Sequence, residues 1–297
     1  MIRVGVWINP AHFPFGGPSA LIVGTLLGLA EIGATVLLNE PGDVNWVPNK
    51  LEEWDDVLVK APNVWCGPCV FHHADADTAA SDLSGHVTWT HVRRAIFPSE
   101  WFQMWINIGL PYLDPEKAQG RKSVIWGTGV DTNSFVARPL AEKTQDFFVY
   151  FKSQNFTDLR DIYRYLFNEW FEMKGHTLTY YYYDHPMLLE AAQKSRFCIM
   201  LNETETQGLA TLEILATDTP IFVIDVEAYV GSRYTLEGAT SVPCWDRRCG
   251  MRSKIKTLAE DFPKFIAALP TYRPREFVLE SYSYKAAAGK LLEVLVR

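Results

Sequence analysis

Short β-branched runs alternate with longer segments that carry an apolar face along most of the chain. The pattern begins with an expected strand over residues 2–8, an expected helix over 20–32 and a second strand over 34–38. The Gly- and Pro-rich run NPAHFPFGGPS separates the first strand from the helix, and Gly33 ends the helix. A strand, a glycine-rich loop, a helix and a strand in this order predict a βαβ unit with a parallel sheet.

The pattern is weaker between residues 39 and 90 and becomes regular again from residue 147. In the first half we expect a short helix over 51–58 and strands near Val64 and over 86–91, 95–99 and 123–126. In the second half we expect strands over 147–151, 177–183, 196–201 and 221–225 and helices over 158–173, 186–194 and 209–217. The four consecutive tyrosines at 180–183 fit an aromatic strand. This alternation again predicts an α/β fold with a parallel sheet.

The length of 297 residues suits two domains of common size. The polar stretch 137–146 is the expected linker, and the residues from 252 on are expected to be mostly helical. We therefore expect a first domain over 1–140, a second domain over 141–280 and a final helix within 281–297.

The overall composition excludes some classes of protein. A net charge of −7 argues against a nucleic-acid binder, because phosphate backbones attract clustered Lys and Arg. The N-terminal run lacks the apolar region of a signal peptide, and the longest apolar stretch, 20–30, is too short to cross a bilayer. Five cysteines, an odd number, suit a reducing compartment. We expect a cytoplasmic protein with no transmembrane segment.

Two carboxylates stand out in the run ETETQGLATLEILATDTPIFVID. Glu205 and Glu213 lie eight positions apart on either side of Gly208, and Glu213 falls within an expected helix. Ionised carboxylates accept hydrogen bonds from sugar hydroxyl groups, and the N–H groups at a helix start attract an anion such as a phosphate. This arrangement favours a nucleotide-sugar site, although surface carboxylates that complement a helix dipole give the same spacing.

The run ETQGLATLE, followed by ATDTPI, is similar to the donor-site signature of family-4-like glycosyltransferases of the GT-B fold. Four other segments resemble the same family in the same order along the chain: FPFGGPSALIVGTLLGLAEIGATVLL, AIFPSEWFQMWI, VIWGTGVDTNSF and PREFVLESYSYKAAAGKLLEVL. The resemblance implies an α/β protein with two Rossmann-like parallel-sheet domains that face a central cleft. It also implies that the C-terminal helix crosses back to the first domain.

The resemblance further implies a glycosyltransferase (a hexosyl- or pentosyltransferase) that moves a sugar from a nucleotide-sugar donor to a hydroxyl of a glycan or other acceptor. We favour a UDP-sugar as the donor, and we expect no metal site and no other cofactor. The signature around Glu205 suggests retention of the anomeric configuration. The ten tryptophans, most of them before residue 127, are consistent with an acceptor site in the first domain.

In the resembled family the second Glu of the signature binds the ribose and the first binds the transferred sugar, which implies these roles for Glu213 and Glu205. The backbone of Gly208 and Leu209 would contact the sugar or the phosphates, and Gly16 and Gly17 would face the diphosphate. The family also uses an Arg and a Lys just after the first strand of the second domain, and these two side chains neutralise the diphosphate as it leaves. Only one has a clear counterpart here, Lys152. Arg160 could supply the second from the following helix, or one of four other arginines could compensate: Arg121, Arg196, Arg233 or Arg247.

Two histidines are further candidates. His12, in the loop after the first strand, could be the general base of an inverting enzyme, because imidazole titrates near neutral pH. His91 could contact the donor sugar from the first domain. A lone histidine in a loop, such as His12, is more often structural, and His91 could equally be a strand-end residue that only forms hydrogen bonds.

Two other functions stay open as alternatives. The lack of a clear second cation suggests a non-catalytic nucleotide- or carbohydrate-binding protein. The run WCGPC, with Cys66 and Cys69, is identical to the thioredoxin motif and would indicate a thiol oxidoreductase. The residues that follow it are a poor match for the long helix that this chemistry needs.

Overall fold

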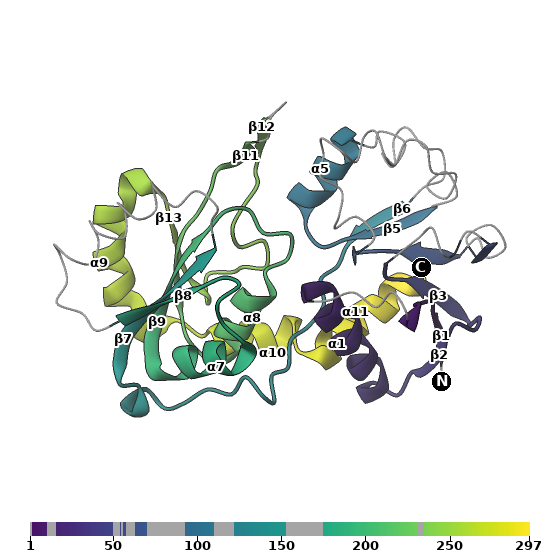
Figure 1. Ribbon diagram of the computed structural model, residues 1–297, viewed down its shortest axis with the longest axis horizontal. Helices are drawn as coiled ribbons and strands as arrows, with labels where there is room; N and C mark the ends of the chain where they lie inside the picture. Colours follow the sequence, from purple (N-terminus) through teal and green to yellow (C-terminus); the bar gives the residue numbers. More distant parts are fainter. Residues whose placement is uncertain are drawn as a thin grey trace. The chain divides into compact units, whose positions relative to one another are not determined.

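The computed structural model describes residues 2–10, 16–49, 54, 56–57, 63–69, 93–109, 122–152, 175–230 and 235–297. The chain divides into two compact units (Figure 1). The first comprises Met1–Gly129, Val230–Leu236 and Tyr282–Arg297, and the second comprises Val130–Tyr229 and Glu237–Ser281. The last helix of the chain therefore belongs to the first unit.

The first unit contains a six-stranded sheet in which every adjacent pair of strands is parallel. The strand order is β2-β1-β3-β4-β5-β6. The strands are β1 (Arg3–Val6), β2 (Thr35–Leu38), β3 (Val44–Val47), β4 (Val64–Cys66), β5 (Arg94–Phe97) and β6 (Lys122–Ile125). Helix α1 (Gly17–Glu31) connects β1 to β2, and α5 (Glu100–Gly109) follows β5.

The core of the first unit is completed by the last helix, α11 (Tyr284–Leu295), which packs on α1. Ala288, Leu291 and Leu295 of α11 are fully buried in the same cluster as the strand residues Val4 and Trp46. The indole N–H of Trp126 also donates to the carbonyl of Ala287 at 2.9 Å. Apolar burial of this kind stabilises a fold by roughly 1.5–3 kcal/mol for each large side chain.

Glycines allow the close approach of α1 to the C-terminal segment. A Cβ atom added to Gly24 would overlap the ring of Tyr284, and one added to Gly28 would overlap the backbone of Tyr284. A Cβ atom at Gly129 would meet the carbonyl oxygen of Ser283 at 2.5 Å. The absence of side chains at these positions therefore determines how closely α11 can pack.

The second unit contains a five-stranded sheet, again parallel between all adjacent strands, in the order β13-β10-β9-β7-β8. The strands are β7 (Gln145–Lys152), β8 (Gly175–Thr179), β9 (Ser195–Asn202), β10 (Ile221–Ile224) and β13 (Gly250–Ser253). A separate pair, β11 (Ala228–Val230) and β12 (Thr235–Glu237), lies between β10 and β13 in sequence. The helices are α7 (His185–Lys194), α8 (Leu209–Ala216), α9 (Leu258–Ala268) and α10 (Pro274–Ser281), with short 3₁₀ helices η5 (Leu140–Glu142), η6 (Ile255–Thr257) and η7 (Leu269–Thr271).

Both faces of this second sheet are covered by helices (Figure 1). Phe147 and Val149 of β7 pack against Phe262 and Phe265 of α9 on one face. Helices α7 and α8 contact each other, and α7 contacts β7 and β9. Because a parallel sheet buries both of its faces, its strands are continuous apolar runs, which made them visible in the sequence.

Arg275, near the start of α10, joins three segments of the second unit. Its guanidinium donates hydrogen bonds to the carbonyls of Phe135 at 2.7 Å and Thr132 at 3.0 Å, and to that of Ala216. Ala216 ends α8, where the helix dipole favours a positive charge. The side chain thus fixes α10 to the C-terminal end of α8.

The expected α/β fold with two parallel sheets is confirmed, as are most of the expected strands and helices. The expected strand over 177–183 is wrong in part, because β8 ends at Thr179 and residues 180–182 form a turn, in which Tyr181 has a φ of 71°. The expected linker 137–146 contains η5 and the first residues of β7 and lies within the second unit. The expected helices over 51–58 and 158–173 and the strand over 86–91 fall wholly or mostly outside the described residues.

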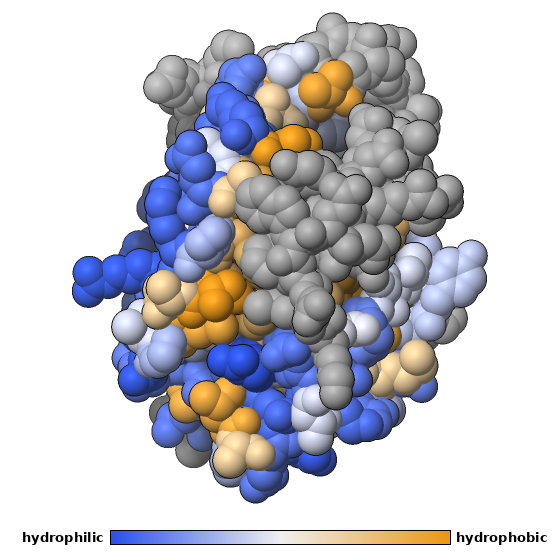
Figure 2. All heavy atoms as spheres, turned by 90° about the vertical axis from the view of Figure 1, so that its left-hand side faces the viewer, coloured by the Kyte–Doolittle hydropathy of each residue, from blue (hydrophilic) through white to orange (hydrophobic). Residues whose placement is uncertain are grey.

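The sequence analysis did not predict β3, β13 or the β11–β12 pair. Strand β3 consists of four buried residues directly before Pro48, too few to show a period. None of the described helices is long and apolar enough to cross a membrane. Among the described residues on the face of the protein in Figure 2, hydrophilic side chains alternate with small hydrophobic patches.

The glycine contact between α1 and α11 can be tested by comparing two helix glycines. Gly28→Ala should destabilise the protein by about 1–2 kcal/mol, because overpacking against the backbone of Tyr284 exceeds the roughly 1 kcal/mol gained in helix propensity. Gly289→Ala in α11 should be neutral or stabilising, because a Cβ atom there meets nothing within 4 Å. Urea denaturation of both variants measures the difference, and equal stabilities would contradict this account of the packing.

Candidate functional site

The second sheet changes the direction of its connections between β7 and β9. From β7 the chain first adds β8 on one side and then adds β9, β10 and β13 on the other. In an open parallel sheet, ligands bind at the carboxyl ends of the strands where the connections diverge. Lys152 ends β7 and Asn202 ends β9, and the two are register partners, so both lie at this position.

Lys152 forms an ion pair with Glu205 at this edge. Its Nζ atom lies 2.6 Å from Oε1 of Glu205, whose side chain is only 11% exposed. The ammonium group also lies 4.5 Å from the ring centroid of Tyr180, within the range of a cation–π interaction. Burial opposes the charge of Lys152, but the charge and hydrogen bond of Glu205 outweigh it, so the pKa of Lys152 lies above its ordinary value. The site therefore holds a fixed positive charge at neutral pH.

The segment that carries Glu205 is fixed through its backbone and through Asn202. The Glu205 N–H donates to the carbonyl of Thr240 at 3.0 Å, and Nδ2 of Asn202 lies 3.5 Å from Oε1 of Glu205. Asn202 is 4% exposed, and its Oδ1 atom has no hydrogen-bond partner among the described residues. Glu205 is thus held from two directions besides Lys152.

Gly208 allows the turn from this segment into α8. It has a φ of 79°, in the left-handed region that glycine adopts without strain, and a Cβ atom there would lie 3.1 Å from Oγ1 of Thr211. Leu209 is the first residue of α8. The N-terminus of α8, which favours negative charge through the helix dipole, therefore lies four residues after Glu205 in the segment that follows β9.

Glu213 lies on α8 and is almost completely buried. Its side chain is 10% exposed, and Oε1 lies 3.8 Å from Nε2 of His185, the first residue of α7. Burial raises the pKa of Glu213 to about 8. A carboxyl group in this state is largely protonated at neutral pH. It becomes charged when the pH rises or when hydrogen-bond donors stabilise the ionised form.

Two tyrosine hydroxyls complete the polar cluster. The hydroxyls of Tyr150, on β7, and Tyr183, before α7, lie 3.0 Å apart. Burial raises the pKa of Tyr183 to about 12, and the negative charges of Glu213 and Glu205 both add to this effect. Both carboxylates therefore lie near the same hydroxyl group, in a cluster that also includes Lys152.

The sequence analysis did not identify Asn202, Tyr150, Tyr180, Tyr183 or His185 as neighbours of the two carboxylates. The ends of the parallel strands were the signal that could have found two of them, since Asn202 ends β9 and Tyr180 directly follows β8. The expected aromatic strand over 177–183 placed Tyr180 within the sheet and so hid this position.

Two of the other predicted site residues lie in the first unit, and three fall outside the described residues. Gly16 and Gly17 lie at the start of α1 in the first unit, and both are exposed. Gly16 has a φ of 68°, and a Cβ atom there would meet nothing within 4 Å, so its backbone conformation rather than lack of space favours glycine. The other three candidates, His12, His91 and Arg160, fall outside the described residues.

The thioredoxin-like pair lies in the first unit. Cys66 ends β4, and both Cys66 and Cys69 are buried and free. Burial raises the pKa of the Cys66 thiol far above its usual range and that of Cys69 to about 12. A reactive dithiol needs a lowered thiol pKa, so this environment is opposite to that of a thiol oxidoreductase.

The chain is similar to several solved structures. A sucrose-phosphate synthase from Thermosynechococcus elongatus matches with a TM-score of 0.56 and 11% identity over 98% of both chains. An alpha-glucosyltransferase, solved with UDP and a 13-mer DNA, matches with a TM-score of 0.55 and 9% identity over 100% of both chains. The lipopolysaccharide outer core galactosyltransferase WaaB in its apo form matches with a TM-score of 0.54 and 10% identity, over 99% of this chain and 98% of that one.

No protein-family model matches the sequence, and no curated protein matches it either. These structures share only about 10% of their residues with this chain, so the similarity establishes the fold. The two parallel-sheet α/β units are those of the GT-B fold, and the fold expected from the sequence is confirmed.

The raised pKa of Glu213 predicts how the stability of the protein depends on pH. The folded state keeps the proton up to about pH 8, whereas the unfolded state loses it near 4.5. The contribution of Glu213 is therefore fully present below pH 4.5, and the free energy of unfolding falls by up to about 1.4 kcal/mol per unit as the pH rises to 8. Glu213→Gln should gain stability relative to the wild type between pH 5.5 and 8.

Urea denaturation across this range measures the effect. Glu227→Gln is the control, because the hydrogen bond and charge of Lys254 lower the pKa of the Glu227 carboxyl, which places its titration below this window. A constant difference between wild type and Glu213→Gln would show that Glu213 titrates normally.

Proposed function

We propose that this protein is a glycosyltransferase that moves a hexose from a nucleotide-sugar, with UDP favoured, to a hydroxyl of a glycan or other acceptor. The observation that carries the proposal is the Lys152–Glu205 ion pair at the switch point of the second sheet, with Glu213 buried nearby on α8. A fixed cation beside two carboxylates suits a ligand that combines a diphosphate with several hydroxyl groups.

Each of the three charged side chains has a distinct role in this proposal. Lys152 binds the diphosphate and stabilises the charge that grows on it as the bond to the sugar breaks. Glu205 accepts hydrogen bonds from hydroxyls of the transferred sugar, and Glu213 accepts them from the ribose. The resemblance to family-4-like glycosyltransferases supports this assignment.

The reaction breaks the bond between the anomeric carbon and the phosphate oxygen and forms a bond from that carbon to the acceptor oxygen. The nucleoside diphosphate leaves with the electron pair, and its freed oxygen takes the proton that the acceptor hydroxyl loses. Lys152 and the N-terminus of α8 supply positive potential for the leaving group without a metal ion, which supports a metal-independent reaction.

The names of the structural neighbours support the donor class. One neighbour is an alpha-glucosyltransferase solved with UDP, and another is a galactosyltransferase. We also propose retention of the anomeric configuration, on the resemblance around Glu205, with inversion through His12 as the alternative. The anomeric configuration of the product, read by NMR, decides between them. Gly16, Gly17, His91 and Arg160 stay predicted donor contacts.

A non-catalytic nucleotide-sugar-binding protein is the second candidate function. It is favoured by the single cation, Lys152, that the described residues at the switch point provide. Release of UDP from a UDP-sugar panel, with and without acceptor glycans, distinguishes an enzyme from a binding protein.

Replacement of Glu205 should separate turnover from donor binding. Glu205→Gln removes the acceptor of the sugar hydroxyls and the partner of Lys152, so we expect a loss of turnover of about 100-fold with donor affinity changed by less than tenfold. Glu203→Gln, two residues away and exposed, is the matched control and should keep turnover within twofold. Unchanged turnover in Glu205→Gln would remove the central residue of the proposal.

The affinity for a UDP-sugar should depend on pH through Glu213. Because the ionised carboxylate accepts both ribose hydrogen bonds, affinity should rise with pH from 6.5 through the pKa of about 8 and level off only above it. A UDP-sugar is the suitable probe, because its diphosphate does not titrate in this range. Calorimetric titration should show that Glu213→Gln loses the pH dependence, whereas His185→Gln, which alters the nearest titratable group, keeps it.

A further inference from the structure

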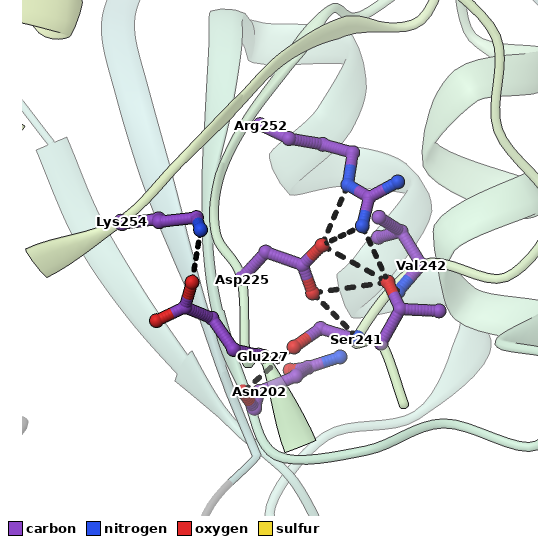
Figure 3. Close-up of polar contacts among 8 residues, drawn as sticks. Asn202, Asp225, Glu227, Ser241, Val242, Arg252 and Lys254 are labelled. Atoms are coloured by element: carbon purple, nitrogen blue, oxygen red, sulfur yellow. Dashed lines mark hydrogen bonds and ion pairs between the residues drawn. The ribbon is translucent and has the colours of Figure 1, made fainter. Parts of the chain in front are cut away.

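A second buried carboxylate lies at the same edge of the second sheet, one strand away from Glu205. Asp225 directly follows β10, and its side chain is only 6% exposed. It accepts hydrogen bonds from the Ser241 N–H at 2.7 Å, from Oγ1 of Thr240 at 3.0 Å and from Nε of Arg252 on β13 at 2.6 Å (Figure 3). The Arg252 guanidinium also forms an ion pair with it at 2.5 Å.

These contacts fix the backbone of residues 240–242. The hydroxyl of Thr240 donates to Asp225 and accepts from the Val242 N–H at 3.1 Å, so it closes a small turn. A buried carboxylate is stable only when it is paired and hydrogen-bonded, so removal of its charge loosens every group that it holds. Asp225 therefore acts as the anchor of this turn.

The turn at residues 240–242 also holds the segment that carries Glu205. The carbonyl of Thr240 accepts from the Glu205 N–H at 3.0 Å. The hydroxyl of Ser241 donates to the carbonyl of Asn202 at 3.0 Å, as Figure 3 shows. Residues 240 and 241 thus contact Asp225 on one side and both ends of the 202–205 segment on the other.

A neighbouring ion pair lacks this connection. Glu227, two residues after Asp225, pairs with Lys254, two residues after Arg252 (Figure 3). Both side chains are about half exposed, at 54% and 49%. Surface pairs of this kind contribute little to stability, and this one gives a matched control of the same charges on the same strand ends.

We propose that Asp225 is a positioning residue for the donor site, which fixes the direction of the Glu205 side chain through the Thr240–Ser241 turn. The proposal rests on the proposed function of Glu205 for its effect on the donor. The link from Asp225 to the Glu205 backbone stands on the contacts above.

Hydrogen exchange tests this link without any substrate. Asp225→Asn keeps the size of the side chain but removes its charge, and it should speed exchange of the Glu205 amide about tenfold, because that amide donates to Thr240. Glu227→Gln should leave the same amide unchanged. Equal exchange in wild type and Asp225→Asn would overturn the proposal, whatever the protein binds.

A double-mutant cycle tests the effect on the donor. Asp225→Asn should lower turnover with a UDP-sugar about tenfold in the wild type and less than twofold in a Glu205→Gln background, because it acts through Glu205. A merely structural role would give the same loss in both backgrounds and would overturn the proposal. If the wild type binds no nucleotide-sugar, the proposed function fails, and hydrogen exchange still decides the positioning role.

A milder variant covers the case in which Asp225→Asn does not fold. Ser241→Ala removes only the hydroxyl that donates to the Asn202 carbonyl. It should speed exchange of the Glu205 amide about threefold and show the same dependence on Glu205 in the cycle. If Ser241→Ala caused the same loss in the wild type and in the Glu205→Gln background, this result would also contradict the proposal.

Discussion

The ion pair between Lys152 and Glu205 is the interaction on which the carboxyl edge of the second sheet depends. It joins the end of β7 to the segment after β9, across the position where the connections of the sheet diverge. The pair joins a nearly buried carboxylate to a partly exposed ammonium group, and each charge offsets part of the cost of burying the other. In the proposed function, a diphosphate that binds Lys152 frees Glu205 for sugar hydroxyls, so recognition of the two parts of the donor is coupled.

The polar cluster around this pair costs stability at neutral pH. Glu213 is buried with a raised pKa, and Oδ1 of Asn202 has no partner among the described residues. Unpaired buried polar groups cost about 1–3 kcal/mol each, and residues at binding sites often carry such a cost. Asp225 differs from both, because its carboxylate is fully paired and serves to hold its neighbours.

The sequence predicted the parts of the fold and site that local pattern controls. The apolar strands of both sheets and the spacing of Glu205 and Glu213 around Gly208 were visible, because each depends on residues close together in the chain. The partners of the site were not, because Tyr150, Asn202 and Asp225 meet it only through the order of the strands. Strand β3 was missed because four residues before a proline carry no period that distinguishes a strand from a loop.

The contact of α11 with the glycines of α1 has a consequence for the order in which the protein forms. The core of the first unit includes residues near both ends of the sequence, whereas almost all of the second unit lies between them. During synthesis, Val4 and Leu29 emerge from the ribosome long before Leu291 and Leu295, which cover them. The N-terminal sheet must therefore wait, with apolar surface uncovered, until the last helix emerges, and chaperones have their main opportunity to bind in this interval.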